Sequence, residues 1–170
     1  MRLIQEAQAV FLKGMATSSW ATGAKSIPIV ELPGYKAVSF RDGDFLLVDM
    51  WAPGDKRFRF SGSTTISFQE TVIWAMHYQG FCSPRASPIL RKILLDTYKK
   101  GIFWGGRGEQ CMSVDDKWRY YNLLRAVSQQ HSFFHFSGEE NLQYSPGCIQ
   151  EEPDARVEYF GQMVAHFDPA

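Results

Sequence analysis

Three titratable side chains lie in segments whose alternating residues are typical of β-strands. They are Asp49, His77 and Glu158, in the segments FLLVDMW, WAMHYQG and ARVEYFG respectively. Histidine exchanges protons near neutral pH, and a carboxyl group buried among aromatic rings gains a raised pKa and can carry a proton. We therefore take His77 as a candidate base, and Asp49 and Glu158 as the acid or as the group that orients the histidine.

The same residues also have structural interpretations. Asp49 can hydrogen-bond to a neighbouring group in the core, and His77 can simply face solvent. Because side chains alternate between the two faces of a strand, His77 lies on the face opposite to Trp74, Met76 and Tyr78. Asp49 and His77 can act together only if both point to the same side of the sheet.

The chain is rich in rings, because Phe, Trp and Tyr make up 15% of its residues. Aromatic side chains stiffen cores, but they also line cavities for flat or apolar ligands. The arginine in WGGRGEQ could bind a carboxylate or phosphate, and the glycines around it suit either a flexible connection or a lid. As candidate ligand-binding residues we take Trp51, Trp74, Tyr78, Trp104, Arg107, Tyr120, Asn122, His135 and Tyr159.

The phrase FRFSG at 58–62 returns as FHFSG at 134–138. Each copy follows one predicted strand and precedes another, so the same order of elements occurs twice. This order indicates an internal duplication, with Gly62 and Gly138 in equivalent turns. Superposing the two copies sets four pairs of residues opposite each other: Asp49 and Asn122, Arg59 and His135, His77 and Glu158, and Tyr78 and Tyr159.

A predicted helix, about 87–100, separates the two copies. Its apolar residues recur at helical spacing, with Ser87 as a cap, Pro88 in the first turn and Gly101 at the end. The chain also begins with an amphipathic segment, MRLIQEAQAVFLKGM, that we expect to be helical.

These elements predict one α+β domain over 1–170. We expect a curved antiparallel sheet built from two duplicated half-sheets, with the intervening helix and the N-terminal helix packed on one face. The half-sheets span about 34–82 and 112–166.

The composition argues against several classes of partner. Lys plus Arg and Asp plus Glu number 18 each, so the formal net charge is zero, and we expect no nucleic-acid partner. The three cysteines form no metal-binding motif and no phosphate-binding or dinucleotide-binding loop is present, so we expect no metal and no cofactor. No apolar run is long enough to span a membrane, so we expect a cytoplasmic protein with reduced thiols. We expect a small-molecule ligand, and an edge strand offers a route to a homodimer.

The run GYKAVSFRDGDFLLVDMW, followed by RFSG, VIWAMHYQG and later FHFSGEE, resembles a family of uncharacterised prokaryotic domains. The resemblance extends from about Phe11 to the end of the chain. It implies that relatives occur alone or behind a Cro/repressor-type helix-turn-helix domain, and it implies no activity. The chain departs from the family in two places. The family has a glutamate after the first repeated glycine, where this chain has Ser63 and Thr64, although the second copy has Glu139 and Glu140 there. The family also usually has an asparagine at the position of His77. Since no helix-turn-helix precedes Phe11, we expect no DNA-binding regulator in one piece.

Taken together, the residues favour a small-molecule-binding domain with an aromatic-lined cavity. One hypothesis is a cofactor-independent isomerase, cyclase or lyase that acts on a small apolar or aromatic metabolite by acid–base chemistry. The alternatives are a non-catalytic ligand-sensing module, related to domains of transcriptional regulators, and a protein-interaction domain whose rings are all core.

Overall fold

A computed structural model describes residues 2–54, 58–114, 117–126, 133–145 and 153–164. Within these ranges the chain forms two helices and nine strands. In chain order they are α1 (Arg2–Thr17), β1 (Ile27–Pro28), β2 (Lys36–Asp42), β3 (Phe45–Pro53), β4 (Arg59–Phe68), β5 (Thr71–Cys82), α2 (Ser87–Lys99), β6 (Cys111–Val114), β7 (Trp118–Ala126), β8 (His135–Tyr144) and β9 (Ala155–Met163).

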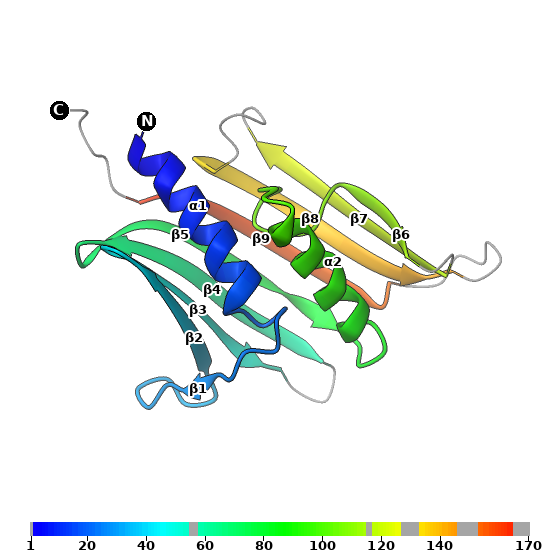
Figure 1. Cartoon of the computed structure of the whole chain (residues 1–170). Coiled ribbons are helices and arrows are strands. Elements are labelled where there is room, and N and C mark those ends of the chain that lie inside the picture. Colours follow the sequence, from blue (N-terminus) through cyan, green and yellow to red (C-terminus); the bar gives the residue numbers. More distant parts are fainter. Residues whose placement is uncertain (1, 55–57, 115–116, 127–132, 146–152, 165–170) are drawn as a thin grey trace.

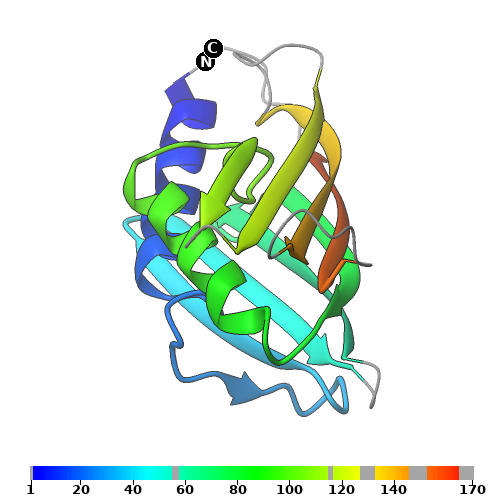
Figure 2. The ribbon, with the colours of Figure 1, turned by 90° about the vertical axis from the view of Figure 1, so that its right-hand side faces the viewer.

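All described strands belong to one antiparallel sheet with the order β1-β2-β3-β4-β5-β9-β8-β7-β6. Figure 1 shows this sheet as one curved surface that does not close on itself, with α1 and α2 on the same face. Figure 2 shows the same arrangement from the side, with the helices in one layer and the sheet in the other. The α+β class and the placement of both helices on one face are therefore confirmed. We call the covered face the inner face and the opposite one the outer face.

The two halves of the sheet share their register around the repeated phrase. Gly62 pairs with Tyr78 where β4 meets β5, and Gly138 pairs with Tyr159 where β8 meets β9. Tyr78 and Tyr159 in turn pair with each other where the halves join, between β5 and β9. The predicted turns at the two glycines are wrong, because both glycines lie inside strands. Duplication of the sequence itself remains a prediction.

The start of α2 differs from the prediction in one detail. Ser87 is the first helical residue, and the cap position falls on Ala86, which makes no side-chain capping bond. The turn before the helix takes over this role, because the Ser83 backbone oxygen accepts from the Ser87 N–H at 3.0 Å. At the other end, Gly101 has φ of 71°, a left-handed conformation that glycine adopts without strain and that ends a helix.

Aromatic packing between the helices and the inner face forms the core. Phe11 of α1 is fully buried, and its ring meets Trp74 of β5 edge-on at 5.2 Å. Trp74 stacks on Phe133 at 4.8 Å and donates its indole N–H to the Phe133 carbonyl at 2.9 Å. These contacts fix α1 over the centre of the sheet, and they assign Trp74 to the core rather than to a ligand site.

Candidate functional site

A cavity of about 270 Å³ lies between the helices and the inner face of β3, β4 and β5. Its walls are largely aromatic and aliphatic. They include Met15 at the end of α1, Trp20, Trp51 of β3, Phe60 of β4 and Leu94 of α2. Asp49, Tyr78, Tyr98 and Arg107 add polar groups to this lining. Apolar walls with a few convergent polar groups are the usual composition of a small-molecule site.

Asp49 is the buried acid of this cavity, with only 2% of its surface exposed. One carboxylate oxygen, Oδ1, accepts hydrogen bonds from Thr64 Oγ1 at 2.9 Å and from Tyr78 Oη at 2.8 Å. No described residue donates to the other oxygen, Oδ2. Burial raises the pKa of Asp49, although the two hydroxyl bonds and the Arg107 charge partly oppose this effect. Asp49 therefore holds its proton more readily than an exposed aspartate.

Tyr78 reaches Asp49 across an intervening strand, and Gly62 makes this possible. The tyrosine is on β5 and the aspartate on β3, so the ring crosses β4 at Gly62. A Cβ atom at Gly62 would lie 2.5 Å from Tyr78 Oη, closer than any carbon can approach. The glycine of the repeated phrase thus serves a side-chain contact between two strands that are not neighbours.

The second buried polar group of the cavity is Arg107, in the loop after α2. Its Nε donates to Glu140 Oε1 at 2.9 Å, and its Nη2 donates to the same oxygen. Tyr120 Oη donates to Glu140 Oε2 at 2.5 Å. Burial alone would lower the pKa of Arg107, but its negatively charged and hydroxyl neighbours, with Glu140 foremost, raise the pKa above its ordinary value. Arg107 therefore remains a cation, paired with Glu140.

Two polar groups remain available to a ligand on this geometry. The guanidinium carbon of Arg107 lies 5.7 Å from the centre of the Tyr78 ring, whose hydroxyl binds Asp49. Within the described ranges, no acceptor contacts Arg107 Nη1. Because Nη1 makes no hydrogen bond to the described residues and is not fully buried, solvent or a ligand can reach it. The cavity thus presents one oxygen of a carboxyl group and one N–H₂ group of a guanidinium.

The equivalent position in the second half of the sheet is occupied by protein. Asn122 lies two residues before the partner of Gly138, as Asp49 lies two residues before the partner of Gly62. Tyr159 Oη donates to Asn122 Oδ1, across Gly138, just as Tyr78 donates to Asp49. Here the amide Nδ2 is also satisfied, because it donates to backbone carbonyl oxygens of the loop between α2 and β6.

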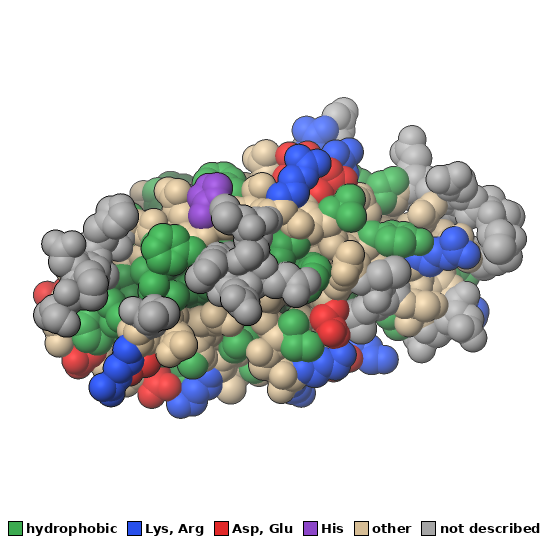
Figure 3. Space-filling view, turned by 90° about the horizontal axis from the view of Figure 1, so that it is seen from above, with side chains coloured by type: hydrophobic (Ala, Val, Ile, Leu, Met, Phe, Trp, Pro, Cys, Tyr) green, Lys and Arg blue, Asp and Glu red, His purple; other side chains and the backbone are tan. Residues whose placement is uncertain are grey.

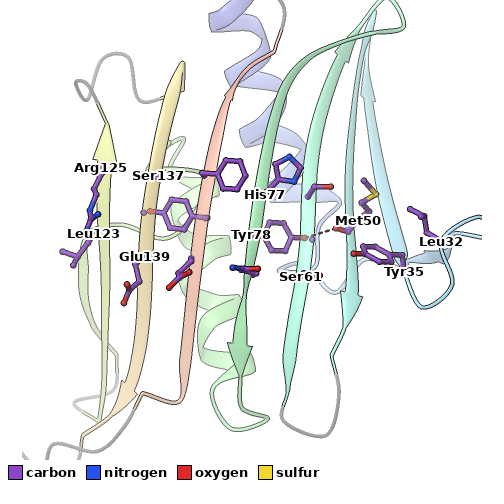
Figure 4. Close-up of a pocket in the computed structure, with 17 residues that line it drawn as sticks. Leu32, Tyr35, Met50, Ser61, His77, Tyr78, Leu123, Arg125, Ser137 and Glu139 are labelled. Carbon is purple, nitrogen blue, oxygen red and sulfur yellow. Dashed lines mark hydrogen bonds between the residues drawn. The ribbon is translucent and has the colours of Figure 1, made fainter.

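The outer face holds the other acid–base candidates. His77, Glu158 and His135 are exposed there, and the His77 ring lies 5.1 Å from the ring of Phe160. Figure 4 looks onto this face, with the helices behind the sheet, and shows His77 pointing away from the inner cavity. Asp49 and His77 therefore do not meet, because the sheet separates them, whereas His77 and Glu158 share the outer face. The reason is strand alternation, which the sequence also shows.

His77 and Glu158 line a more open groove of about 770 Å³ on the outer face (Figure 4). Glu158 lies 3.4 Å from the Arg156 guanidinium and both side chains are about half exposed. Because solvent reaches these groups, a ligand there would displace water without being enclosed. We therefore assign the candidate site to the inner cavity.

Of the predicted ligand-binding residues, the structure brings Trp51, Tyr78 and Arg107 together in the inner cavity. Tyr120 and Asn122 do not line this cavity, but they hold residues next to it. Tyr120 donates to Glu140, the partner of Arg107, and Asn122 donates to the loop that carries Arg107. Tyr159 is the counterpart of Tyr78 and lines the outer groove. Trp104 belongs to the same loop as Arg107, and its indole nitrogen is buried without a hydrogen bond in the described part of the chain.

Besides apolar wall residues such as Trp20 and Phe60, three residues of the hydrogen-bond network around the cavity were not predicted: Thr64, Tyr98 and Glu140. Glu140 shares the inner face of β8 with Phe136 and Leu142, so period-two alternation could have identified it as a buried acid. Thr64 is its counterpart on β4, two residues after Gly62. Tyr98 Oη donates to the Gly106 carbonyl at 2.8 Å and so holds the Arg107 loop against α2, a contact that no spacing in the sequence reveals.

In the ranges that the structure describes, no three His, Cys, Asp or Glu side chains are grouped to hold a metal ion. Likewise, none of the described helices has the length and apolar character needed to cross a membrane. On the face seen in Figure 3, Lys and Arg side chains lie beside Asp and Glu rather than forming a patch of one sign. No protein-family model, curated protein or solved structure matches the chain.

Proposed function

We propose that this protein binds a small, mostly apolar molecule in the inner cavity, with the polar end of that molecule at Asp49 and Arg107. One observation carries the proposal. A partly open cavity with aromatic walls contains a carboxyl oxygen and a guanidinium nitrogen that no described residue satisfies. Buried polar groups are costly unless they are hydrogen-bonded, so a bound molecule that completes both groups would stabilise the protein.

The size and lining of the cavity limit the ligand. A volume of about 270 Å³ suits a molecule of one or two rings rather than a nucleotide or a long lipid. Trp20, Trp51 and Phe60 offer flat surfaces, so planar or aromatic frames would bury the most apolar area. Each Å² of apolar surface removed from water contributes roughly 25 cal/mol, which rewards a ligand that fills the space.

The proposal is tested by filling the cavity. Ala21 is buried and lines the cavity, so Ala21→Phe puts a ring into the ligand space, while Ala75→Phe places the same ring on the central strand β5 at a half-buried position. Melting temperatures would be measured with a panel of small aromatic and aliphatic compounds. We expect some compounds to stabilise the native protein and Ala75→Phe but not Ala21→Phe. Equal shifts in Ala21→Phe would place binding elsewhere and contradict the proposal.

A second candidate function is proton transfer on the bound molecule. Asp49 favours it, because a buried carboxyl group with a raised pKa can donate or accept a proton near the cavity. An isomerase, cyclase or lyase reaction without a cofactor would then depend on Asp49 alone among the acid–base residues predicted from the sequence. Once a ligand is known, Asp49→Asn separates the two functions: it abolishes turnover in an enzyme and leaves a sensing module able to bind.

The half-buried, free thiol of Cys82 at the cavity wall suits a reducing, cytoplasmic compartment. The resemblance to domains that accompany repressor-type DNA-binding units supports a sensing role for the same cavity. The proposal includes a homodimer that forms through an edge strand and leaves the cavity unchanged.

A further inference from the structure

Asp49 and Asn122 occupy matching positions in the two half-sheets. Thr64 donates an additional hydrogen bond to Asp49, and the surroundings of the second side-chain atom differ. In each half a tyrosine donates to Oδ1 across a glycine on the intervening strand: Tyr78 of β5 to Asp49, and Tyr159 of β9 to Asn122. The second side-chain atom is Nδ2 in Asn122 and Oδ2 in Asp49. Nδ2 donates to the Gly108 carbonyl at 2.7 Å and to the Trp104 carbonyl at 3.4 Å, whereas no described residue donates a hydrogen bond to Oδ2 of Asp49.

In the second half, the loop of residues 102–108 thus fills the position that a ligand would take beside Asn122. Gly105 and Gly106 have φ of 60° and 69°, which lets the backbone approach the sheet closely. A Cβ at Gly105 would lie 2.7 Å from the Tyr159 ring. The backbone therefore fills the space above Asn122 and presents carbonyl oxygens to it. The space above Asp49 is the inner cavity.

From this comparison, and resting on the proposed function, we infer that the ligand presents a carbonyl oxygen to Asp49, which binds it as a carboxylic acid. A protonated Asp49 has the same pattern as Asn122: Oδ1 accepts from a tyrosine, and the second atom donates. Arg107 Nη1 supplies further donors at the same cavity. The ligand class is then a neutral ketone, ester, amide or lactone on a small apolar or aromatic frame.

An amine is the competing ligand class, because aromatic walls and an ionised carboxylate also suit a cation. Two arginines argue against it. Glu140 pairs with Nε and Nη2 of Arg107 but not with Nη1, and Arg59 also lines the cavity, so a further cation would meet positive charge there. The raised pKa of Asp49 agrees with the carbonyl class, because burial favours the protonated form that donates a hydrogen bond.

Binding of the two classes depends on pH in opposite directions, so the neighbours of Asp49 matter. Tyr78 of β5, Tyr98 of α2 and Cys82 of β5 all have a pKa raised by burial, that of Cys82 to about 12. Arg107 of the loop stays charged. Arg59 of β4 also lines the cavity and carries a positive charge. Asp49 is thus the cavity group that changes charge in the acidic range.

Three probes of similar size test the inference: acetophenone, ethylbenzene and α-phenylethylamine. Their affinities for the native protein and for Asp49→Asn would be measured by calorimetry or by NMR titration over the pH range in which the protein is folded. We expect acetophenone to bind about threefold to tenfold more tightly than ethylbenzene, which corresponds to one hydrogen bond. Its affinity should fall as the pH rises and Asp49 ionises. Asp49→Asn should bind acetophenone with no pH dependence, because its amide donates as Asn122 does.

The outcomes separate this inference from the proposed function. If acetophenone and ethylbenzene bind equally, or the amine binds best and gains affinity as the pH rises, the cavity is a ligand site but the carbonyl assignment is wrong. Loss of acetophenone binding in a folded Asp49→Asn protein also contradicts the assignment. If no probe binds the native protein, or Ala21→Phe binds all of them unchanged, the proposed function fails as well. Melting temperatures of the variants show that they are folded.

Discussion

Tyr78 Oη lies 2.8 Å from Asp49 Oδ1, although the two residues belong to strands that are not neighbours in the sheet. The contact exists because Gly62, on the strand between them, carries no side chain. Tyr159, Gly138 and Asn122 repeat the arrangement in the second half. The repeated phrase FxFSG therefore marks the place where a tyrosine crosses a strand to bind a polar side chain beyond it.

Gly62→Ala and Gly138→Ala should each destabilise the protein. A Cβ at either position overlaps a buried tyrosine, and forcing extra volume into a packed site costs roughly 1–3 kcal/mol. Urea denaturation would measure the loss, with Ser61→Ala, one residue from Gly62 and half-buried, expected to stay within about 0.5 kcal/mol of native. Native-like stability of both glycine variants would show that the tyrosines move aside at no cost.

The stability of the protein should fall with rising pH because of Asp49. Its pKa is raised in the folded state, so the unfolded chain releases this proton first. The free energy of unfolding is thus unaffected by this group below its ordinary pKa of 3.8, and it decreases as the pH rises from there through the folded pKa.

Asp49→Asn removes the titrating group, so its stability should be flatter with pH than that of the native protein. Urea denaturation at a series of pH values measures the difference, and Asp96→Asn on α2, which is half-buried, serves as the matched control. A native protein and an Asp49→Asn variant with parallel pH profiles would argue that Asp49 ionises as easily as an exposed aspartate.

Arg107 and Glu140 should be energetically coupled. Both are buried and paired, so Arg107→Met leaves an uncompensated carboxylate and should cost roughly 3–5 kcal/mol. Adding Glu140→Gln to that variant should recover part of the loss, which a double-mutant cycle measures. Lys100→Met breaks the more exposed pair with Glu109 and should cost below about 1 kcal/mol. Simple additivity of the Arg107 and Glu140 effects would contradict the pairing.

Cys82 should react slowly with iodoacetamide in the folded protein. Burial raises its pKa from 9.0 to about 12, which lowers the thiolate fraction near neutral pH by roughly a thousandfold. Peptide mapping by mass spectrometry resolves this cysteine from the other two, and the unfolded protein gives the reference rate. A bound ligand should slow the reaction further, since Cys82 lines the cavity. Rapid alkylation in the native state would mean that the cavity wall opens easily.

His77→Ala should leave ligand binding in the cavity unchanged. The histidine lies on the outer face, against Phe160, and contributes to no contact with Asp49. The measurement is the affinity of a cavity ligand for His77→Ala and for Asp49→Asn. It is made at one pH where Asp49 is protonated and at another where Asp49 is ionised. An effect of His77→Ala as large as that of Asp49→Asn would mean that the outer groove is the functional site.

Much of the fold follows from local patterns in the sequence. Alternation predicts that Trp74, Met76 and Tyr78 face the core and that His77 faces away, and burial agrees. The helix before the second half follows from apolar spacing and from Gly101. The predicted role of the repeated glycines is wrong, because each glycine lies inside a strand and accommodates a tyrosine ring from the neighbouring strand instead of forming a turn.

The site itself depends on contacts between distant residues, which spacing does not reveal. Asp49 and Arg107 come from β3 and from the loop after α2, and only the packing of both helices on the inner face brings them to one cavity. Glu140 is 33 residues from Arg107 in sequence, so their pairing depends on how the loop after α2 packs against β8. Matching the two halves identified Asp49 and Asn122 as counterparts. It did not reveal that a loop covers Asn122, whereas Asp49 lines a cavity.

A crystal structure of the protein soaked with small aromatic fragments would show where the chain binds such molecules. We predict fragment density in the cavity between α1, α2 and β3–β5, with a polar atom within hydrogen-bonding distance of Asp49 Oδ2 or Arg107 Nη1. Fragments found only in the outer groove beside His77, with the inner cavity closed by its own side chains, would contradict it.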